Sequence, residues 1–484
     1  MSTPNVHPMG TTIYDPEKAW SGYTLMPITP HGAVLIDMNG NVVRFWENFQ
    51  GFPNKMLPGG YIMGSLGGRN SAYGYQDQAD LTEIDWDGRV VWSFNKKEFL
   101  EDNGNNYWMA RQHHDYQREG NPVGYYVPGM EAKTDSGSTL ILCHEDVYNK
   151  RITDKRLLDD CIIEVDWEGN IIWKWNVNEH FKELDFDEMQ KTVLFRNPNY
   201  HPIGAEGQSD WMHINSMSVL GPNKWYDAGD DRFHPDNIIW DARESNIMAI
   251  ISKATGKIVW KIGPDFTKTK ELRAIGQIIG QHHCHLIPRG LPGEGNILLF
   301  DNGGWAGYGA PSRTSKDGTK VDMRDHSRIL EIDPVTLKVV WEFTGFSFGG
   351  LMPMVTNNQF YSQLISAAQR LPNGNTMITE GCAGRIFEVT PKKEVVWEYY
   401  APFDKIKPMI YRAYRYPYEY VPQLQAPEEI PVVRLNNQTF RVPGAAEGML
   451  QNTVTVDEAW GYEKMDACVT EDESPDEDEI KAKF

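Results

Sequence analysis

Four segments of the chain place histidines beside turn and strand signals, and they are the strongest candidates for chemistry. A neutral imidazole can act as a nucleophile on sulfur or phosphorus near pH 7. Several imidazoles brought together can instead bind Zn, Cu, Fe or Mn. The four segments are RQHHDYQ with His113 and His114, WMHINS with His213, QHHCH with His282, His283 and His285, and RDHSR with His326.

Two polar residues and one aromatic residue stand close to these histidines in the sequence. Asn215 follows His213 by two positions, and Arg243 ends the strand-like run NIIWDA. A planar guanidinium can bind two oxygens of one anion, so imidazoles with one arginine suit a small anion whose charge grows during a reaction. Trp211 lies off the repeat described below, which makes it a candidate for substrate binding.

A repeated hairpin predicts the elements that must position these residues. Each copy is a short strand, a turn rich in Asp, Gly, Asn or Lys, and a second strand that ends in tryptophan; the alternation has period two. The six copies are LIDMNGNVVRFW from Leu35, LTEIDWDGRVVWSF from Leu81, CIIEVDWEGNIIWKW from Cys161, IMAIISKATGKIVWKI from Ile247, RILEIDPVTLKVVWEF from Arg328 and RIFEVTPKKEVVWEYY from Arg385.

A second unit, a turn followed by an apolar strand, precedes most of the hairpins. The two units together give four strands per repeat, and six repeats predict an all-β, six-bladed β-propeller. The spacing is uneven and longer than in compact propellers, so we expect long loops on the faces. The innermost strands of a propeller surround a central channel, and histidines that precede different hairpins should converge there. Most tryptophans are expected to close the blade cores.

The repeat also predicts the domain organisation. We expect an N-terminal arm over residues 1–30, a catalytic propeller over 31–400, and an irregular C-terminal extension over 401–484. The extension begins with a Tyr/Pro-rich segment that should wrap the propeller. It ends with EDESPDEDEI, residues 471–480, whose acids predict a disordered tail.

Composition excludes several classes of function. The net charge is −20, which argues against nucleic-acid binding. No window approaches the length of apolar sequence needed to span a bilayer, so no membrane association is expected. The N-terminus has no basic and apolar leader, and the 5 cysteines form no CxxC pair. These features predict a cytoplasmic protein in a reducing compartment.

The ordered series of motifs resembles the bacterial aryl-sulfate sulfotransferases, the PAPS-independent arylsulfotransferase family. The resemblance is carried by DWMHINSMSV, by DNIIWDARESNIMAIISKATGKIVWKIGP, by GQHHCHLIPRG with GNILLFDNGG, and by SRILEIDPVTLKVVWEF. It covers roughly residues 86–400, and the stretch 210–304 is its most specific part. The family is usually periplasmic, with a signal peptide and an N-terminal β-sandwich, and this sequence shows neither.

The resemblance implies a reaction and a role for each matching residue. The family transfers a sulfuryl group from an aryl sulfate to a phenol through a sulfohistidine, without a nucleotide or other cofactor. Its partners are therefore small aromatic donors and acceptors. By motif, His282 resembles the nucleophile, His213 and Asn215 the oxygen-binding pair, Arg243 the arginine that holds the sulfuryl oxygens, and His114 the histidine near the phenolic oxygen. His113, His283, His285 and Trp211 are expected to contribute to substrate binding.

Two other interpretations stay open at the level of sequence. The family has one histidine after the glutamine where this chain has three, and neutral imidazoles from several blades make a good metal site. The alternative is a metal-dependent lyase, hydrolase or oxidase built on His114, His213, His282 and His283 or His285. A third interpretation is a binding propeller without catalytic activity.

Overall fold

The computed structural model describes residues 9–67, 76–102, 105–201, 207–348, 357–403, 409–436 and 444 of the 484-residue chain. The chain divides into two compact units, Met1–Arg434 and Leu435–Phe484. The first unit contains all of the secondary structure given below. The acidic run 471–480 and Cys468 lie outside the described residues.

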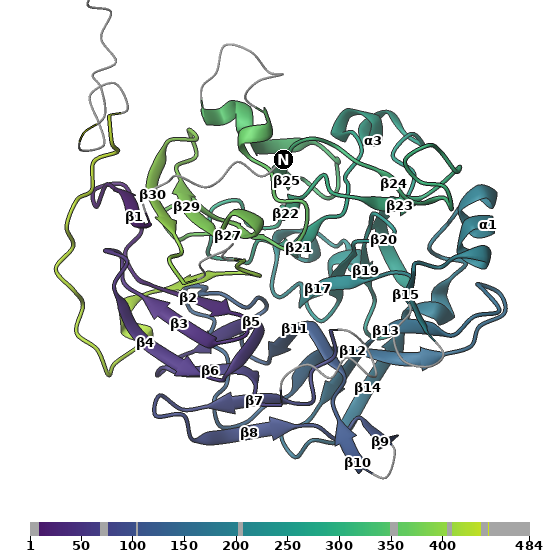
Figure 1. Ribbon diagram of the computed structural model, residues 1–484, viewed down its shortest axis with the longest axis horizontal. Coiled ribbons are helices and arrows are strands. Elements are labelled where there is room, and N and C mark those ends of the chain that lie inside the picture. Colours follow the sequence, from purple (N-terminus) through teal and green to yellow (C-terminus); the bar gives the residue numbers. More distant parts are fainter. Residues whose placement is uncertain are drawn as a thin grey trace, which may run out of the picture. The chain divides into compact units, whose positions relative to one another are not determined.

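The first unit is a six-bladed β-propeller, as the repeat predicts (Figure 1). Each blade is an antiparallel sheet whose first strand is the innermost. Blade 1 consists of β31 (Tyr414–Tyr416), β2 (Tyr23–Ile28), β3 (Gly32–Ile36) and β4 (Val42–Glu47). Blade 2 consists of β5 (Gln50–Leu57), β6 (Tyr61–Ser65), β7 (Leu81–Ile84) and β8 (Val90–Phe94). Blade 3 consists of β11 (Gln112–Arg118), β12 (Thr139–Val147), β13 (Leu157–Val165) and β14 (Ile171–Asn176).

The other three blades follow the same order from the centre outward. Blade 4 consists of β17 (Ile214–Val219), β18 (Ile238–Ala242), β19 (Ile247–Ile251) and β20 (Ile258–Ile262). Blade 5 consists of β21 (His282–Leu286), β22 (Ile297–Asp301), β25 (Arg328–Ile332) and β26 (Val339–Thr344). Blade 6 consists of β27 (Ala367–Arg370), β28 (Thr376–Glu380), β29 (Arg385–Val389), β30 (Val395–Tyr400) and, at the outer edge, β1 (Gly10–Tyr14).

Both ends of the first unit take part in closing the propeller. β1 pairs with β30, and β31 pairs with β2, so N-terminal and C-terminal strands share blades 1 and 6. The propeller strands therefore extend beyond the boundaries of 31–400 expected from the repeat. The physical reason is that β1, β2 and β31 lack the Asp/Gly turn and terminal tryptophan by which the repeat was found. The segment YRAYRY, expected as part of a wrap, supplies the innermost strand of blade 1.

Tryptophans on the outer strands join each blade to the next. The indole N–H of Trp260 on β20 donates to the carbonyl of Pro334 in the β25–β26 turn of blade 5, at 2.8 Å. Equivalent bonds run around the whole propeller. This tryptophan ring consists of Trp46 to Trp86 O, Trp92 to Trp167 O, Trp175 to Gly256 O, Trp260 to Pro334 O, Trp341 to Pro391 O and Trp397 to Met38 O. The repeated tryptophan thus satisfies a turn carbonyl of the neighbouring blade in addition to filling core space.

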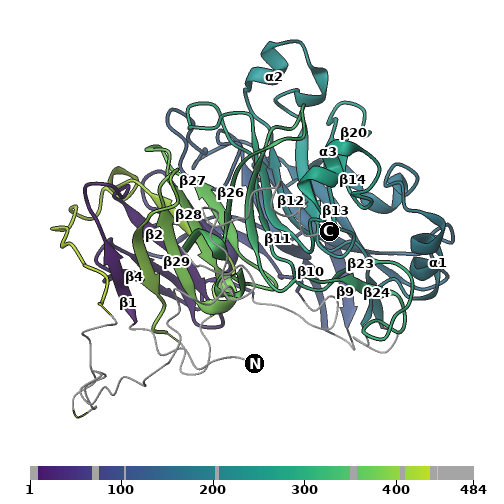
Figure 2. The ribbon, with the colours of Figure 1, turned by 90° about the horizontal axis from the view of Figure 1, so that it is seen from above.

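Insertions between the blade strands form the face loops. They carry two small sheets, β9 (Glu98–Asp102) with β10 (Asn105–Met109) and β23 (Ala306–Tyr308) with β24 (Thr319–Asp322), and the short strands β15 (Tyr200–His201) and β16 (Gln208–Asp210) beside blade 3. The described helices are α1 (Glu188–Arg196), α2 (Lys224–Asp227) and α3 (Lys270–Ile275). Figure 2 shows α2 on one face of the propeller and the two small sheets toward the other. In the described ranges, no helix has the length and apolar character that a bilayer crossing requires.

Candidate active site at the propeller axis

The innermost strands of blades 3, 4 and 5 begin with irregular backbone where the histidines stand. The strand register shifts between Gln112 and Tyr116 in β11, between Ile214 and Ser216 in β17, and between His282 and His285 in β21. Three histidines at these points have left-handed backbone: His114 (φ 56°), His213 (φ 54°) and His283 (φ 54°). Such conformations cost about 1–3 kcal/mol each outside glycine and cluster at functional sites, and bulges redirect side chains next to them.

His114 and His213 meet at the axis. Their ring centroids are 4.6 Å apart, with the planes at 71°. Nδ1 of His213 lies 2.6 Å from Oδ2 of Asp210, and both side chains are buried. Burial alone would raise the pKa of Asp210, but the adjacent His213 holds it below its usual range. The carboxylate therefore keeps a proton on Nδ1 of His213 and orients the ring.

His282 is protonated on Nδ1, so its Nε2 atom has a lone pair. Its Nδ1 lies 2.7 Å from Oδ1 of Asn302, whose Nδ2 donates to the carbonyls of Ser362 and Ile365. Because the amide nitrogen of Asn302 is used for those two bonds, its oxygen is the acceptor and Nδ1 of His282 carries the proton. Burial lowers the pKa of His282 well below its usual value, and the Arg243 charge lowers it further. The ring is therefore neutral at pH 7.

The backbone of Ile365 contacts the reactive side of His282. Its N–H donates to Nε2 of His282 at 3.2 Å, and Ile365 and Ser366 have φ angles of 57° and 88°. Left-handed backbone at a β-branched residue is rare and needs support from its surroundings. The Asn302 side chain gives that support through the carbonyl of Ile365, so one residue holds both the imidazole and the amide that faces it.

Arg243 lies beside this pair and is the most accessible member of the group. Its backbone N–H donates to the carbonyl of His213 at 3.0 Å, and its guanidinium contacts Glu244. Arg243 is 9% exposed and His213 is 6% exposed, whereas His113 is 0% exposed. Solvent therefore reaches the site from the side of Arg243 and His213. We refer to His114, His213, Arg243 and His282 as the axial group.

Two aromatic rings form a wall next to His114. Phe52 on β5 stacks on Tyr411 with centroids 3.8 Å apart, and Phe52 lies 4.7 Å from the ring of His114. The hydroxyl of Tyr411 donates to the carbonyl of Asn215 at 3.0 Å. A flat apolar surface beside an imidazole suits an aromatic ring that carries a polar atom.

Asn215 is held by its neighbours on the axis. Its Nδ2 donates to the carbonyl of Gln281 at 2.8 Å, which links β17 to the segment that carries His282. Its Oδ1 is buried without a hydrogen-bond partner among the described residues. The side chain expected to bind oxygens thus uses one amide hydrogen to bind the protein, and its acceptor oxygen is unpaired.

His283 and His285 belong to a different cluster from the axial group. Nε2 of His283 lies 3.0 Å from the hydroxyl of Tyr414, and Nε2 of His285 lies 2.8 Å from the hydroxyl of Tyr125. The cavity beside them has a volume of about 10 Å³. That space accommodates about one water and no aromatic ring. The histidine set of the metal-enzyme interpretation is therefore divided between two clusters.

Of the other residues expected in the site, Trp211 and His113 contact protein groups. Trp211 is fully buried in the core of blades 3 and 4, and its indole donates to Asp159 at 2.9 Å. His113 stacks on His144 with centroids 3.5 Å apart and places Nδ1 2.8 Å from Nδ1 of His114. His326 pairs with Asp325 at the surface.

Sequence reasoning missed several residues that shape the site. Asp210 stands three positions before His213, and Asn302 lies in the FDNGG motif. Both residues are therefore close to motifs already identified in the sequence. Phe52, Tyr411 and Arg412 had no such signal, because they lie in β5 and in the segment before β31, which lack the repeated turn. Arg412 is buried and donates to Asp115 at 2.9 Å and to the carbonyl of Asn215 at 3.1 Å. Two acids at the end of β12 pair with basic residues: Asp146 with Arg111 and Glu145 with Lys174.

Comparison with protein families gives one match that covers more than half of the chain. The model described as Arylsulfotransferase (ASST) matches residues 130–412. That span includes His213, Arg243 and His282 of the axial group and begins after His114. No curated protein matches the chain at a significant level.

Solved structures with a similar fold are distant in sequence. A protein of unknown function from Bacteroides caccae shares 13% identity over 82% of this chain and 98% of that chain, with a TM-score of 0.41. The Dos1 propeller shares 11% identity over 82% and 73%, with a TM-score of 0.34. Virginiamycin B lyase from Staphylococcus aureus shares 10% identity over 79% and 86%, with a TM-score of 0.33. At such identities a likeness extends to the fold alone.

Proposed function

Because the chain belongs to the arylsulfotransferase family, we propose that it transfers a sulfuryl group from an aryl sulfate to a phenol, with His282 as the nucleophile. One observation carries the proposal: the neutral ring of His282, with its proton fixed on Nδ1 by Asn302, lies within a group that also contains Arg243, His213 and His114. A lone pair next to a guanidinium and two imidazoles is suited to attack on an anionic ester.

In the first half-reaction, Nε2 of His282 attacks the sulfur of the aryl sulfate. The bond from sulfur to the aryl oxygen breaks, and its electron pair leaves with that oxygen, which accepts a hydrogen bond from the N–H of His114 and takes up a proton from solvent on release. The product is a phenol, and His282 carries the sulfuryl group as a sulfohistidine. Nδ1–H of the charged ring continues to donate to Asn302, whose amide dipole stabilises the positive charge.

In the second half-reaction, a phenol acceptor loses its proton to solvent, and its oxygen, held by a hydrogen bond from the N–H of His114, attacks the sulfur. The sulfur–nitrogen bond breaks, and its electron pair returns to Nε2 of His282. Arg243 and His213 stabilise the charge on the three sulfuryl oxygens in both steps. The Ile365 amide, released from Nε2 when that atom forms its bond to sulfur, becomes a further donor for these oxygens. Phe52 and Tyr411 provide the surface for the aryl ring.

A transfer assay with a chromogenic aryl sulfate tests the proposal. Release of nitrophenol from nitrophenyl sulfate should increase with phenol concentration, and double-reciprocal plots at several phenol concentrations should be parallel, as ping-pong kinetics require. His326→Gln, which changes a surface histidine paired with Asp325, should leave the rates unchanged. Intersecting plots would count against a covalent intermediate, and release that does not depend on phenol would count against a phenol acceptor.

A further inference from the structure

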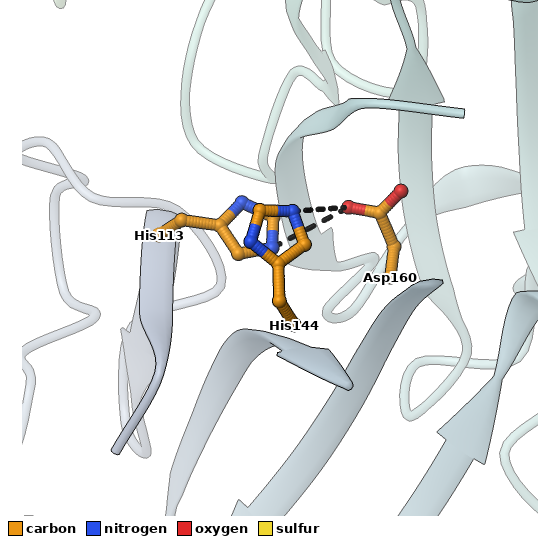
Figure 3. Close-up of side chains that lie close together, drawn as sticks. All are labelled: His113, His144 and Asp160. Atoms are coloured by element: carbon orange, nitrogen blue, oxygen red, sulfur yellow. Dashed lines mark ion pairs between the residues drawn. The ribbon is translucent and has the colours of Figure 1, made fainter. Parts of the chain in front are cut away.

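Trp305 is an exception among the tryptophans that the structure describes. Each of the others contacts another ring or donates its indole N–H. Buried rings also pair, as where His113 and His144 stack face to face beside Asp160 (Figure 3). Trp305 is 48% exposed, and among the described residues its indole has no ring contact, cation or hydrogen bond. Its aromatic face is therefore free to bind a ring from solution.

Trp305 lies on the face of the propeller where the axial group opens to solvent. It follows Asn302, the residue that fixes the proposed nucleophile, by three positions. A methyl group placed on Gly280 would lie 3.5 Å from Cβ of Ala306 and 3.7 Å from Cγ of Arg243, so this segment borders the arginine. Ala306 is buried, whereas Trp305 is exposed. The indole therefore lies at the surface, next in sequence to a residue that packs beside the axial group.

A cavity of about 420 Å³ opens beside the indole. Trp305, residues 314–317, Thr319 and Lys320 line it, so two lysines, Lys316 and Lys320, share the cavity with the tryptophan. Neither lysine has a hydrogen bond or ion pair from its ammonium group to any residue that the structure describes. The volume accommodates an aromatic ligand of one or two rings. The cavity thus combines a free aromatic face with two free cations.

Strained backbone carries one of these two cations. In the β23–β24 pair, Ala306 is opposite Asp322 and Tyr308 is opposite Thr319, so β24 has one residue more than β23 between these partners. Lys320 lies in this bulge and has a φ of 55°. Left-handed backbone is uncommon for a residue with a long side chain, and a bulge redirects the side chain that it carries. Strain of this kind gathers at binding sites, and here it belongs to a residue that lines the cavity.

Asp317 also lines the cavity, but hydrogen bonds in and beside the turn use both of its oxygens. Oδ1 accepts from the backbone N–H and the hydroxyl of Thr319 at 3.1 Å and 3.0 Å, and Oδ2 accepts from Nδ2 of Asn197 at 2.7 Å. Two ammonium groups against this one carboxylate leave the cavity with an excess of positive charge. The whole chain, in contrast, has a net charge of −20. An anion that carries an aromatic ring matches both the charge and the indole.

We propose that Trp305, Lys316 and Lys320 form a binding site for aromatic anions, with the indole against the ring of the ligand and the ammonium groups beside its anionic group. An aryl sulfate has both parts. Bound here, it is held on the face from which the axial group is reached, which raises the concentration of donor near Arg243. This donor role rests on the proposed sulfotransferase activity, whereas the binding of an aromatic anion does not.

Lysine labelling of the full-length protein tests the binding site itself. Acetylation by an N-hydroxysuccinimide ester is followed by mass spectrometry with and without naphthalene sulfonate, an aromatic anion whose carbon–sulfur bond prevents sulfuryl transfer. At saturation, Lys316 and Lys320 should react at least about threefold more slowly. Lys257, which is exposed in the turn between β19 and β20, is the control and should react at an unchanged rate. Unchanged rates at Lys316 and Lys320, or equal slowing of Lys257, would overturn the proposal.

The part played by the indole is tested by comparing two exposed tryptophans. Trp305→Ala should raise the naphthalene sulfonate concentration that gives half protection by at least about fivefold, because the ligand ring loses the surface on which it stacks. Trp108→Ala changes a tryptophan that is 45% exposed on β10 and contacts Phe99, and it should leave that concentration unchanged. The same half-protection concentration in Trp305→Ala as in the wild type would overturn the proposal.

The donor role is tested with the double variant Lys316→Gln/Lys320→Gln. Ping-pong kinetics give kcat/KM for the aryl sulfate and for the phenol separately. The value for the aryl sulfate should fall about three- to tenfold, because exposed cations attract an anion only modestly, and the value for the phenol should not change. An equal fall of both values, or no fall for the aryl sulfate, would overturn the donor role. Absence of transfer by the wild type, with lysine protection intact, would instead reject the proposed function.

Discussion

The outermost and innermost strands of the propeller follow opposite rules. On the outer strands, the same tryptophan recurs in every blade and makes the same bond to the next blade, from Trp46 to Trp397. The outer strand pairs also share the same register shift in all six blades. The inner pairs differ from blade to blade: blades 2 to 5 shift register and blades 1 and 6 do not, and His114, His213 and His283 adopt left-handed backbone. Regularity at the rim supplies a rigid frame, and this frame lets the axis hold strained backbone and buried imidazoles.

Among substitutions that distinguish the axis from the rim, Arg243→Lys at the axis should have the largest effect, and that effect is on kcat. Lysine keeps the charge beside His282 but loses the planar pair of donors for two sulfuryl oxygens. We expect kcat to fall by about 10²–10³-fold, with little change in the free energy of unfolding. Steady-state kinetics and urea unfolding of the same preparation check this. A variant within threefold of the wild type would show that Arg243 does not contact the transferred group.

Trp260→Phe, at the rim, should lower the stability of the protein and leave kcat unchanged. Phenylalanine keeps an aromatic ring but removes the indole N–H, which leaves the carbonyl of Pro334 without its donor. The free energy of unfolding should fall by about 1–3 kcal/mol. The kcat of the folded protein should remain within twofold of the wild type. A large loss of kcat at unchanged stability would contradict a purely structural role for the tryptophan ring.

The contributions of His285 on the inner strand β21 and of Trp260 at the rim to the free energy of unfolding should also respond differently to pH. Burial lowers the pKa of His285 from 6.5 to about 4. As pH falls through 6.5, the unfolded chain binds a proton that the folded protein does not, so stability decreases toward acid pH. Between pH 8 and pH 6, His285 should account for a loss of about 1 kcal/mol.

Urea unfolding of two variants at pH 8 and pH 6 separates this effect from the rim. His285→Gln should reduce the pH-dependent loss by that amount, whereas Trp260→Phe should lower stability equally at both values. An unchanged pH dependence in His285→Gln would show that the ring of His285 is not held neutral.

The same contrast explains what could be predicted from the sequence. The hairpins repeat because every blade needs the same turn and the same tryptophan. The six-bladed fold and the family could therefore be predicted from the sequence. His114, His213, Arg243 and His282 could be proposed as site residues because each stands next to a repeated element, and their roles stay predictions. β31 could not be predicted, since it closes blade 1 by pairing with β2 and carries no turn signal. The separation of His282 from His283 and His285 depends on the bulge in β21, which periodicity does not report.

The central claim is that His282 carries the sulfuryl group. The protein should be incubated with an aryl sulfate in the absence of phenol, digested, and analysed by mass spectrometry at neutral pH. We expect one SO₃ increment on the peptide that contains His282, lost on acid treatment or on addition of phenol, and absent in His282→Gln. An increment that persists in His282→Gln, or that maps to His114 or His213, would contradict the account.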